Sequence, residues 1–392
     1  MMLIDCVAVS TASNPLASQE FRHGWARLRS LFSGTTLWLE TPEEGAQAVQ
    51  QALVDCTAAR ALPDNARVLL LAHGHLLLTH GVLARLSEVL DADSGISSVH
   101  AFDSTHPPPQ TPDYCTLRGM ERYVDALDRT APENLSDDGS RPALVTLTTL
   151  GAVRTGQVLA RAHWVSKAYV HDFSDYHGGR REEVLALMAP GTCRLLDVGG
   201  GEGGFLDAAK GVFGCETHLA EYSPEACIKA SRHVDQVWEG DFLTQPFMGL
   251  ENRGTSAFDC ITFLDVLEHA IDPQKWLQRA RELLTPGGSV VASIPNVGHW
   301  GVIADLLEGR WDYCPVGIHC VTHVRFFTEH TLRDLFLDSG FAVERLDYVK
   351  VPCPAPWAAH WAQTPGLEVQ AAGWDTYAFL VRAHPIPGWA AP

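Results

Sequence analysis

Residues 194–204 read RLLDVGGGEGG, an apolar run followed by five glycines within six positions. Leu195, Leu196 and Val198 fit a buried parallel strand, and the glycines fit a tight turn into a helix that begins at Phe205. Glycine lets the backbone approach a ligand because it lacks a Cβ, and the first turn of a helix offers unpaired N–H groups. We therefore expect a polar ligand on this turn.

Two cofactor classes compete for the turn. Gly199, Gly201 and Gly204 satisfy G-x-G-x-x-G, the dinucleotide fingerprint. Asp197 and Glu202 oppose that interpretation, because carboxylates beside the turn would repel a pyrophosphate at the helix N-terminus. A cationic or zwitterionic ligand suits the two acidic residues better. A purely structural glycine turn is the third interpretation.

The stretch resembles the first motif of the class I S-adenosylmethionine-dependent methyltransferases, which reads apolar-apolar-Asp-apolar-Gly-x-Gly-x-Gly. The matching residues are Asp197, Gly199, Gly201 and Gly203. Gly200 and Glu202 depart from the residues that the family often has there. The resemblance runs from about residue 175 to residue 384. It implies a Rossmann-like α/β sheet with a reversed seventh strand, S-adenosylmethionine as cofactor, S-adenosylhomocysteine as product, and a methyltransferase activity (EC 2.1.1.-).

Further cofactor-binding candidates follow the next predicted strands. Glu221 follows the second predicted strand, residues 216–220, and lies about 20 residues after the first glycine, the spacing at which a carboxylate binds ribose hydroxyls; Tyr222 adjoins it. The resemblance places Asp241 and Phe242 beside the adenine. A loop Asp after a glycine is the alternative for Asp241. Asp265 follows the fourth predicted strand, residues 258–264, at the sheet edge where ligands bind.

The segment between the fifth strand and the last helix is rich in aromatic and charged side chains. In class I enzymes the corresponding segment often builds the acceptor pocket. We therefore predict that it binds the substrate through His299, Trp311, Tyr313 and Arg325. The alternative is that the same aromatic residues only pack as a lid.

Two histidines are the candidate catalytic bases. His269 and His323 qualify because imidazole has an ordinary pKa of about 6.5, near neutral pH. A structural hydrogen bond is the alternative for each of them. His319, Cys320 and His323 have compact spacing, but a closed zinc site needs four ligands and no fourth follows at a standard interval. We therefore predict no metal.

Length and composition indicate an ordered protein with two domains. The chain has 392 residues, of which 46% are hydrophobic and 19% charged, and this length exceeds a single typical domain. We place the boundary between residues 174 and 175. Alternating strand and helix patterns in residues 1–174 predict a smaller α/β domain with a central parallel sheet. Residues 175–392 form the predicted methyltransferase domain.

The first domain weakly resembles a nucleotide-sugar glycosyltransferase of the GT-A type. In that family an apolar strand ends in Asp-x-Asp, which binds a metal-bound diphosphate. Here the corresponding residues are His73, Gly74 and His75. Neutral imidazoles compensate a diphosphate-bound Mg²⁺ poorly, because hard cations prefer oxygen ligands. We therefore predict a degenerate or repurposed domain.

Charge and cysteine usage limit the partners. A formal net charge of −18 disfavours nonspecific binding to nucleic acid or to an anionic membrane. The ten cysteines form no C-x-x-C pair, and the N-terminus lacks the pattern of a signal peptide. No apolar run approaches the roughly 20 residues that span a bilayer. We expect a cytoplasmic protein with a small-molecule acceptor, and a homodimer is the assembly to test.

Three functions remain open after these steps. The first is methyl transfer to oxygen or nitrogen of a small polar acceptor, sugar-containing or otherwise biosynthetic. The second is a noncatalytic scaffold that binds S-adenosylmethionine or S-adenosylhomocysteine, which Asp197, Glu221 and Asp265 together disfavour. The third is a bifunctional glycosyltransferase-methyltransferase, which the missing Asp-x-Asp disfavours.

Overall fold

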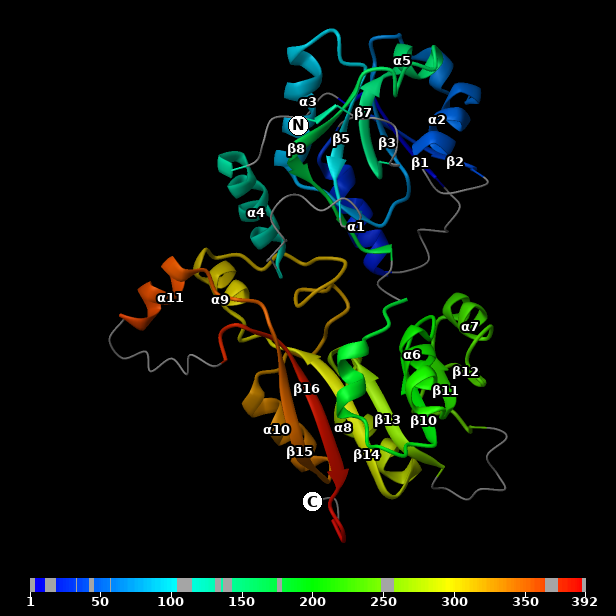
Figure 1. Cartoon of the computed structure of the whole chain (residues 1–392), viewed down its shortest axis with the longest axis vertical. Helices are drawn as coiled ribbons and strands as arrows, with labels where there is room; N and C mark the ends of the chain where they lie inside the picture. Colours follow the sequence, from blue (N-terminus) through cyan, green and yellow to red (C-terminus); the bar gives the residue numbers. More distant parts are fainter. Residues whose placement is uncertain are drawn as a thin grey trace. The chain divides into compact units, whose positions relative to one another are not determined.

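The protein consists of two compact units, shown in a computed structural model (Figure 1). The structure describes residues 4–10, 19–32, 34–41, 46–56, 58–103, 115–130, 135–136, 143–174, 178–247, 257–363 and 373–389. The first unit comprises Met1–Ser174 and Asp312–Val321, and the second comprises Asp175–Trp311 and Thr322–Pro392. The segment Asp312–Val321 therefore groups with the first unit, although it lies within the stretch predicted to bind the acceptor.

The first unit contains a seven-stranded sheet in the order β2-β1-β3-β7-β5-β8-β6. Its strands are β1 (Cys6–Ser10), β2 (Thr35–Leu39), β3 (Arg67–Leu71), β5 (Ser98–Phe102), β6 (Leu135–Ser136), β7 (Val145–Thr149) and β8 (Ala162–Tyr169). Strand β1 pairs in parallel with β2 and β3, but β7 runs antiparallel to β3 and β5. The sheet is thus mixed rather than parallel throughout, because a short apolar run does not encode the direction of its strand.

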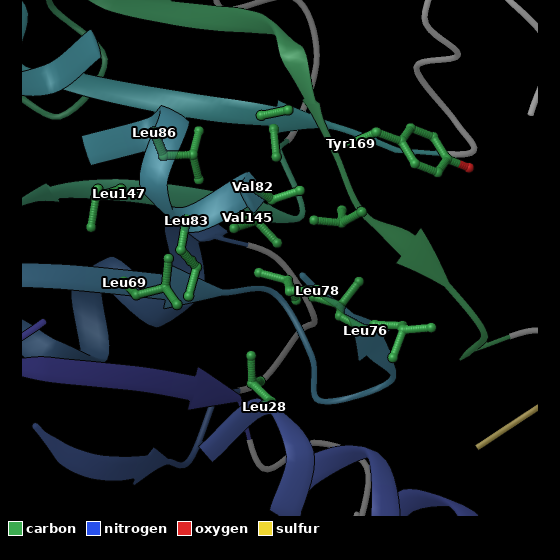
Figure 2. Close-up of a cluster of buried hydrophobic side chains, with 14 of the residues drawn as sticks. Leu28, Leu69, Leu76, Leu78, Val82, Leu83, Leu86, Val145, Leu147 and Tyr169 are labelled. Atoms are coloured by element: carbon green, nitrogen blue, oxygen red, sulfur yellow. The ribbon is translucent and has the colours of Figure 1, made fainter. Parts of the chain in front are cut away.

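Helices pack against this sheet and close its core. They are α1 (Gln19–Ser30), α2 (Ala46–Asp55), α3 (His80–Ala92), α4 (Leu117–Thr130) and α5 (Leu150–Arg154), with a 3₁₀ helix at Ala59–Ala61 and a small ladder of β4 (Leu76–Leu77) with β9 (His171–Asp172). Figure 2 shows Val82, Leu83 and Leu86 of α3 among Leu69 of β3 and Leu147 of β7. Helix α4 was not expected from the sequence.

The second unit contains a second seven-stranded sheet, in the order β12-β11-β10-β13-β14-β16-β15. Its strands are β10 (Arg194–Val198), β11 (Glu216–Glu221), β12 (Gln236–Glu239), β13 (Phe258–Leu264), β14 (Leu284–Pro295), β15 (Phe341–Lys350) and β16 (Thr376–Pro385). The first five are parallel, and β16 lies antiparallel between β14 and β15. The predicted Rossmann-like sheet with its reversed seventh strand is confirmed.

The helices of the second unit are α6 (Gly204–Phe213), α7 (Pro224–Ala230), α8 (Pro273–Leu283), α9 (Trp300–Leu307), α10 (Glu329–Asp338) and α11 (Ala355–Ala362), with 3₁₀ helices at Glu182–Leu187 and Leu267–His269. Polar side chains cap several of them. Ser223 caps α7 and Asp272 caps α8, each followed by a proline in the first turn. Helices α9 and α11 were not expected.

Parallel pairing brings the carboxyl ends of three strands to one edge of the second sheet. Val198 of β10 pairs with Ala220 of β11 on one side and with Phe263 of β13 on the other. The residues that follow each strand must therefore meet at this edge, where open α/β sheets bind ligands. None of the described helices is long and apolar enough to cross a membrane.

The core of the second unit provides a test of the fold. Phe336 of α10 is fully buried, with its ring 6.3 Å from that of Phe341, whereas the next residue, Leu337, is 57% exposed. We expect Phe336→Ala to lower the free energy of unfolding by about 3 to 5 kcal/mol, because it leaves a cavity. The matched Leu337→Ala should change it by less than about 0.5 kcal/mol. Urea denaturation of the full chain measures the free energy of unfolding of both variants, with the transition of the second unit identified by its stabilisation with S-adenosylhomocysteine. Equal decreases in the two variants would contradict this packing.

Candidate active site

The glycine turn connects β10 to α6 and leaves no room for side chains at several of its positions. Gly199 has φ +68°, and a Cβ there would lie 2.9 Å from Cγ2 of Val266. A Cβ on Gly200 would lie 2.1 Å from Oδ2 of Asp197. The departure from the family pattern at Gly200 thus has a physical reason, because the carboxylate of Asp197 occupies the space that a larger residue would need.

Asp197 is a buried carboxyl group beneath this turn. Its side chain is 1% exposed, Oδ1 accepts a 2.6 Å hydrogen bond from the hydroxyl of Thr262, and Oδ2 has no partner among the described residues. Burial raises its pKa to about 7; the Thr262 hydrogen bond opposes that rise, and the Glu221 carboxylate adds to it. A ligand that donates a hydrogen bond or carries positive charge would satisfy Oδ2.

Glu221 binds the glycine turn from the neighbouring strand. Its Oε2 accepts a 2.9 Å hydrogen bond from the amide of Gly201, and its Oε1 accepts one of 2.8 Å from the amide of Ser223. The carboxylate therefore stands at the end of β11, beside the turn, as the spacing in the sequence predicts. Backbone amides hold it there in a fixed orientation.

Asp265, at the end of β13, belongs to a charged network that the sequence did not indicate. Its Oδ1 accepts a 2.7 Å hydrogen bond from the hydroxyl of Ser293, and its Oδ2 accepts one from Nη1 of Arg181. Nη2 of Arg181 also donates to the Ser293 hydroxyl, at 2.9 Å. Arg181 and Asp265 both have left-handed backbone angles, φ 44° and 56°. Such angles in non-glycine residues are costly and cluster at functional sites.

Asp197, Asp265, Arg181 and part of the glycine turn line one cavity of about 100 Å³. Its lining residues are Gly179, Arg181, Asp197, Gly199, Gly200, Gly201, Phe205, Leu264 and Asp265. An acidic, glycine-lined cavity fits S-adenosylmethionine, whose sulfonium and ammonium groups carry positive charge. Small-molecule pockets usually have roughly 300 Å³ or more, so we expect the Arg181 side chain to move when the cofactor binds.

A larger hollow of about 550 Å³ lies on the other side of the turn. Four of its charged side chains form two ion pairs: Lys229 binds Glu202 at 2.5 Å, and Arg180 binds Asp207 at 2.6 Å. All four side chains are at least one third exposed, so solvent satisfies what the pairs do not. We assign the cofactor to the smaller cavity because it contains the buried, partly unpartnered Asp197.

Five of the predicted cofactor-binding residues lie outside the lining of the smaller cavity: Gly203, Glu221, Tyr222, Asp241 and Phe242. Tyr222 is 79% exposed, and Asp241 accepts a 3.1 Å hydrogen bond from the amide of Leu243. Phe242 is 2% exposed and packs on Phe263, with the ring centroids 5.8 Å apart. Cofactor contacts by these residues stay predictions.

The predicted bases His269 and His323 lie together, beside a buried glutamate. Their ring centroids are 4.7 Å apart, and Nε2 of His323 is 3.9 Å from Oε1 of Glu268. Glu268 is fully buried, and neither of its carboxylate oxygens has a hydrogen-bond partner among the described residues. Burial, with help from the Asp265 charge, raises the pKa of Glu268 well above its ordinary range. No role for Glu268 was predicted from the sequence.

His299 caps a helix. Its Nδ1 accepts from the amide of Gly301 at 3.1 Å, and its Nε2 lies 3.2 Å from the carbonyl of Val351. The ring is fully buried, and burial lowers its pKa to about 4. Both ring nitrogens thus face protein backbone, and its predicted contact with substrate stays a prediction.

The other predicted acceptor residues are divided between the two units. Trp311, in the second unit, stacks edge-on against Phe326 at 5.2 Å between centroids. The guanidinium of Arg325 donates to the carbonyls of Ile271 and Val324. Tyr313 belongs to the first unit, where its carbonyl lies 2.9 Å from Nε2 of His23. His319 and Cys320 also belong to the first unit, whereas His323 belongs to the second.

In the first unit, the motif at His73 follows β3. Nδ1 of His73 accepts a 3.3 Å hydrogen bond from the amide of His75, and Nε2 is 3.7 Å from Oδ1 of Asp172. His75 packs edge-on against Phe173. The degenerate glycosyltransferase character of this unit stays a prediction.

Arg181, Ser293 and Glu268 are the site residues that sequence reasoning missed. The sequence contained a sign that Glu268 has a role in the site: in the stretch VLEHA this acidic residue stands between an apolar run and His269. Arg181 and Ser293 gave none, because their roles depend on contacts with residues distant in the chain.

The methyltransferase domain family matches residues 118–346, more than half of the chain. A ubiquinone biosynthesis O-methyltransferase of Xanthomonas axonopodis pv. citri is 31% identical over 118 residues, 30% of this chain and 49% of that protein. Its namesake in Cereibacter sphaeroides is 30% identical over 169 residues, 42% of this chain and 67% of that protein. The chain thus spans about half of the first relative and two thirds of the second. A methyltransferase structure from Mesorhizobium loti matches 53% of this chain and 98% of its own, with 17% identity and a TM-score of 0.36.

The Glu221 carboxylate provides the first test of the site. We expect Glu221→Ala to weaken S-adenosylhomocysteine binding by about 2 to 3 kcal/mol, because charged hydrogen bonds to ligand and turn are lost. The control is Glu225→Ala, which removes the same charge from an exposed position in the first turn of α7. Calorimetry measures both, with NAD as a comparison ligand. Unchanged affinity in folded Glu221→Ala, or tighter binding of NAD, would refute the assignment.

Asp197 predicts a pH dependence of stability. Its pKa of about 7 in the folded, ligand-free chain exceeds its ordinary value of 3.8. Between these values the unfolded chain releases a proton that the folded chain retains, so this residue's contribution to stability falls as pH rises from 4 to 7. Asp197→Asn removes this contribution. We therefore expect the variant to gain stability relative to the natural chain as pH rises, and thermal denaturation at pH 4, 5.5 and 7 measures it. A constant difference would contradict the prediction.

Proposed function

The chain belongs to the class I S-adenosylmethionine-dependent methyltransferases, and on this premise we propose that it methylates an oxygen atom of a small polar acceptor. The cofactor supplies a methyl group on a positively charged sulfur. Two relatives named as O-methyltransferases support oxygen as the acceptor atom. A sugar-containing or another biosynthetic acceptor is the substrate class that we propose.

The proposal depends on one observation: a cluster of titratable side chains lies next to the cavity that we assign to the cofactor. Asp265 lines that cavity, and Glu268 and His269 follow Asp265 closely in the sequence. The charges of Asp265 and Arg181 both act on Glu268, so the two sites are close in space. His323 completes the group from a distant part of the sequence. An acceptor hydroxyl held here would lie near the cavity that we assign to the cofactor.

Each part of the site then has a chemical task. Glu221 and the glycine turn bind and orient the cofactor, and Asp197 with Asp265 supplies the negative charge that favours a sulfonium. Holding donor and acceptor in line lowers most of the barrier to such a displacement. The acceptor hydroxyl must also lose its proton, and we propose that His269 or His323 acts at that step.

Site variants separate the catalytic role from the binding role. We expect His323→Ala and His269→Ala each to lower kcat by roughly 10² to 10⁴, because the acceptor proton is then removed poorly. S-adenosylhomocysteine affinity should change little. His330→Ala is the control, because its side chain is 87% exposed and pairs only with Asp334 among the interactions described.

Arg325→Ala should raise KM for an anionic acceptor, since a guanidinium binds carboxylate or phosphate with two hydrogen bonds. Methyl transfer from labelled S-adenosylmethionine to a panel of hydroxylated small molecules measures all four variants. Folded variants with unaltered kinetics would move the active site elsewhere. A natural chain that binds the cofactor but methylates nothing in the panel would favour the noncatalytic scaffold.

A further inference from the structure

Three side chains with metal-binding chemistry converge beyond the end of β13. Glu268 and His269 come from the 3₁₀ helix Leu267–His269, and His323 comes from the segment that begins at Thr322. One ligand atom from each residue lies within 4.8 Å of the other two. Glu268 and His323 are buried and His269 is half-buried, so the group opens to solvent on one side only.

The carboxylate of Glu268 lacks the partners that a buried charge requires. It is fully buried, and neither oxygen accepts a hydrogen bond from the described residues. Asp265 adds negative charge nearby, while the guanidinium of Arg181 is bound to Asp265 and Glu183. A buried carboxyl group in such surroundings holds either a proton or a cation.

The geometry of the two histidines favours a cation. Nδ1 of His269 lies 3.3 Å from the carbonyl oxygen of Thr322, which can only accept, so in the neutral imidazole Nδ1 carries the hydrogen and Nε2 keeps its lone pair. This is how the second nitrogen of a metal-bound histidine is usually held. Nε2 of His323 is 3.9 Å from Oε1 of Glu268, too far for a hydrogen bond. Two ligands of one tetrahedral ion stand roughly 3.4 Å apart, which is close to this distance.

The backbone holds the two ligand-bearing segments together. The carbonyl of Glu268 accepts hydrogen bonds from the amides of Val324, at 2.9 Å, and Arg325, at 3.0 Å. These bonds attach the residues after His323 directly to the helix that carries Glu268 and His269. The three ligands are therefore assembled before any ion binds, and small rotations of the imidazoles suffice to close the group.

We propose that Glu268, His269 and His323 bind one divalent transition-metal ion of the zinc type. Two imidazoles and a carboxylate form the ligand set of zinc sites that keep an open coordination position, whereas magnesium and calcium prefer oxygen ligands throughout. The sequence suggested no metal because the third ligand is distant from the other two in the chain.

The open position, which rests on the proposed function, takes the acceptor hydroxyl. Bound to the ion, the hydroxyl loses its proton to water more readily. Its oxygen then forms the bond to the methyl carbon as the carbon–sulfur bond breaks and the electron pair returns to sulfur. In the metal-bound protein His269 and His323 act as ligands, and the ion promotes the loss of the acceptor proton.

The metal alone tests the site. The full-length chain is stripped with a chelator, dialysed and titrated with Co²⁺, whose visible absorption reports its ligands, and Zn²⁺ is then measured by competition. We expect one saturable site per chain. Glu268→Gln, His269→Ala and His323→Ala should each weaken Co²⁺ binding at least tenfold, and His330→Ala should bind as the natural chain does. S-adenosylhomocysteine binding by every variant verifies that it is folded.

Two results would overturn the metal site: no saturable binding, or equal binding by the natural chain and all three ligand variants. Glu268 would then hold a proton. Measuring methyl transfer by the metal-free protein distinguishes a failure of the metal site from a failure of the proposed function. Oxygen methylation at full rate in stripped protein that binds no Co²⁺ refutes the metal and retains the function. Saturable Co²⁺ binding that the three substitutions abolish supports the metal, even if no oxygen acceptor is methylated.

Discussion

The hydrogen bond from the Gly201 amide to the Glu221 carboxylate holds the glycine turn against the neighbouring strand. Apart from Glu202 the turn consists of glycines, whose backbone adopts many conformations, and it must stay open for a ligand. Glu221 supplies the missing constraint from β11, while its other oxygen accepts from Ser223 at the start of α7. One carboxylate thus fixes the turn and the start of the next helix. The same carboxylate is the group that we predict to bind the cofactor.

Buried carboxyl groups give the second unit its chemical character. Among the described residues, Asp197 has one oxygen bonded to Thr262 and the other without a hydrogen-bond partner, and neither oxygen of Glu268 has a hydrogen-bond partner. Each such group destabilises the folded chain, because an unsatisfied polar atom loses its contact with water. Groups of this kind concentrate at functional sites, where a ligand compensates them. The charge of Arg181 acts on both carboxyl groups, and the charge of Asp265 acts on Glu268.

The sequence predicted the second sheet closely because its strands are short apolar runs bounded by glycine, proline and acidic residues. Strand β13 has the predicted bounds, Phe258–Leu264. Strand β14 begins before residue 289, where the sequence predicts its start, since Leu284 already pairs with Phe258 before a register shift. Helix α9 was missed because His299, its cap, was interpreted as a substrate ligand. Local patterns identify strands and caps, but they do not say which polar residue a fold will use internally.

The sequence by itself determined where the strands of the second unit lie along the chain and which residues form the glycine turn, because each depends on local spacing, and the motifs on these elements implied the family. Only the tertiary structure decided that β7 runs antiparallel, that Arg181 binds Asp265, and that Glu268 lies with His269 and His323. These features join segments that are distant in sequence, and their partners are selected by packing and by the cost of burying charge. A local pattern contains no information on either.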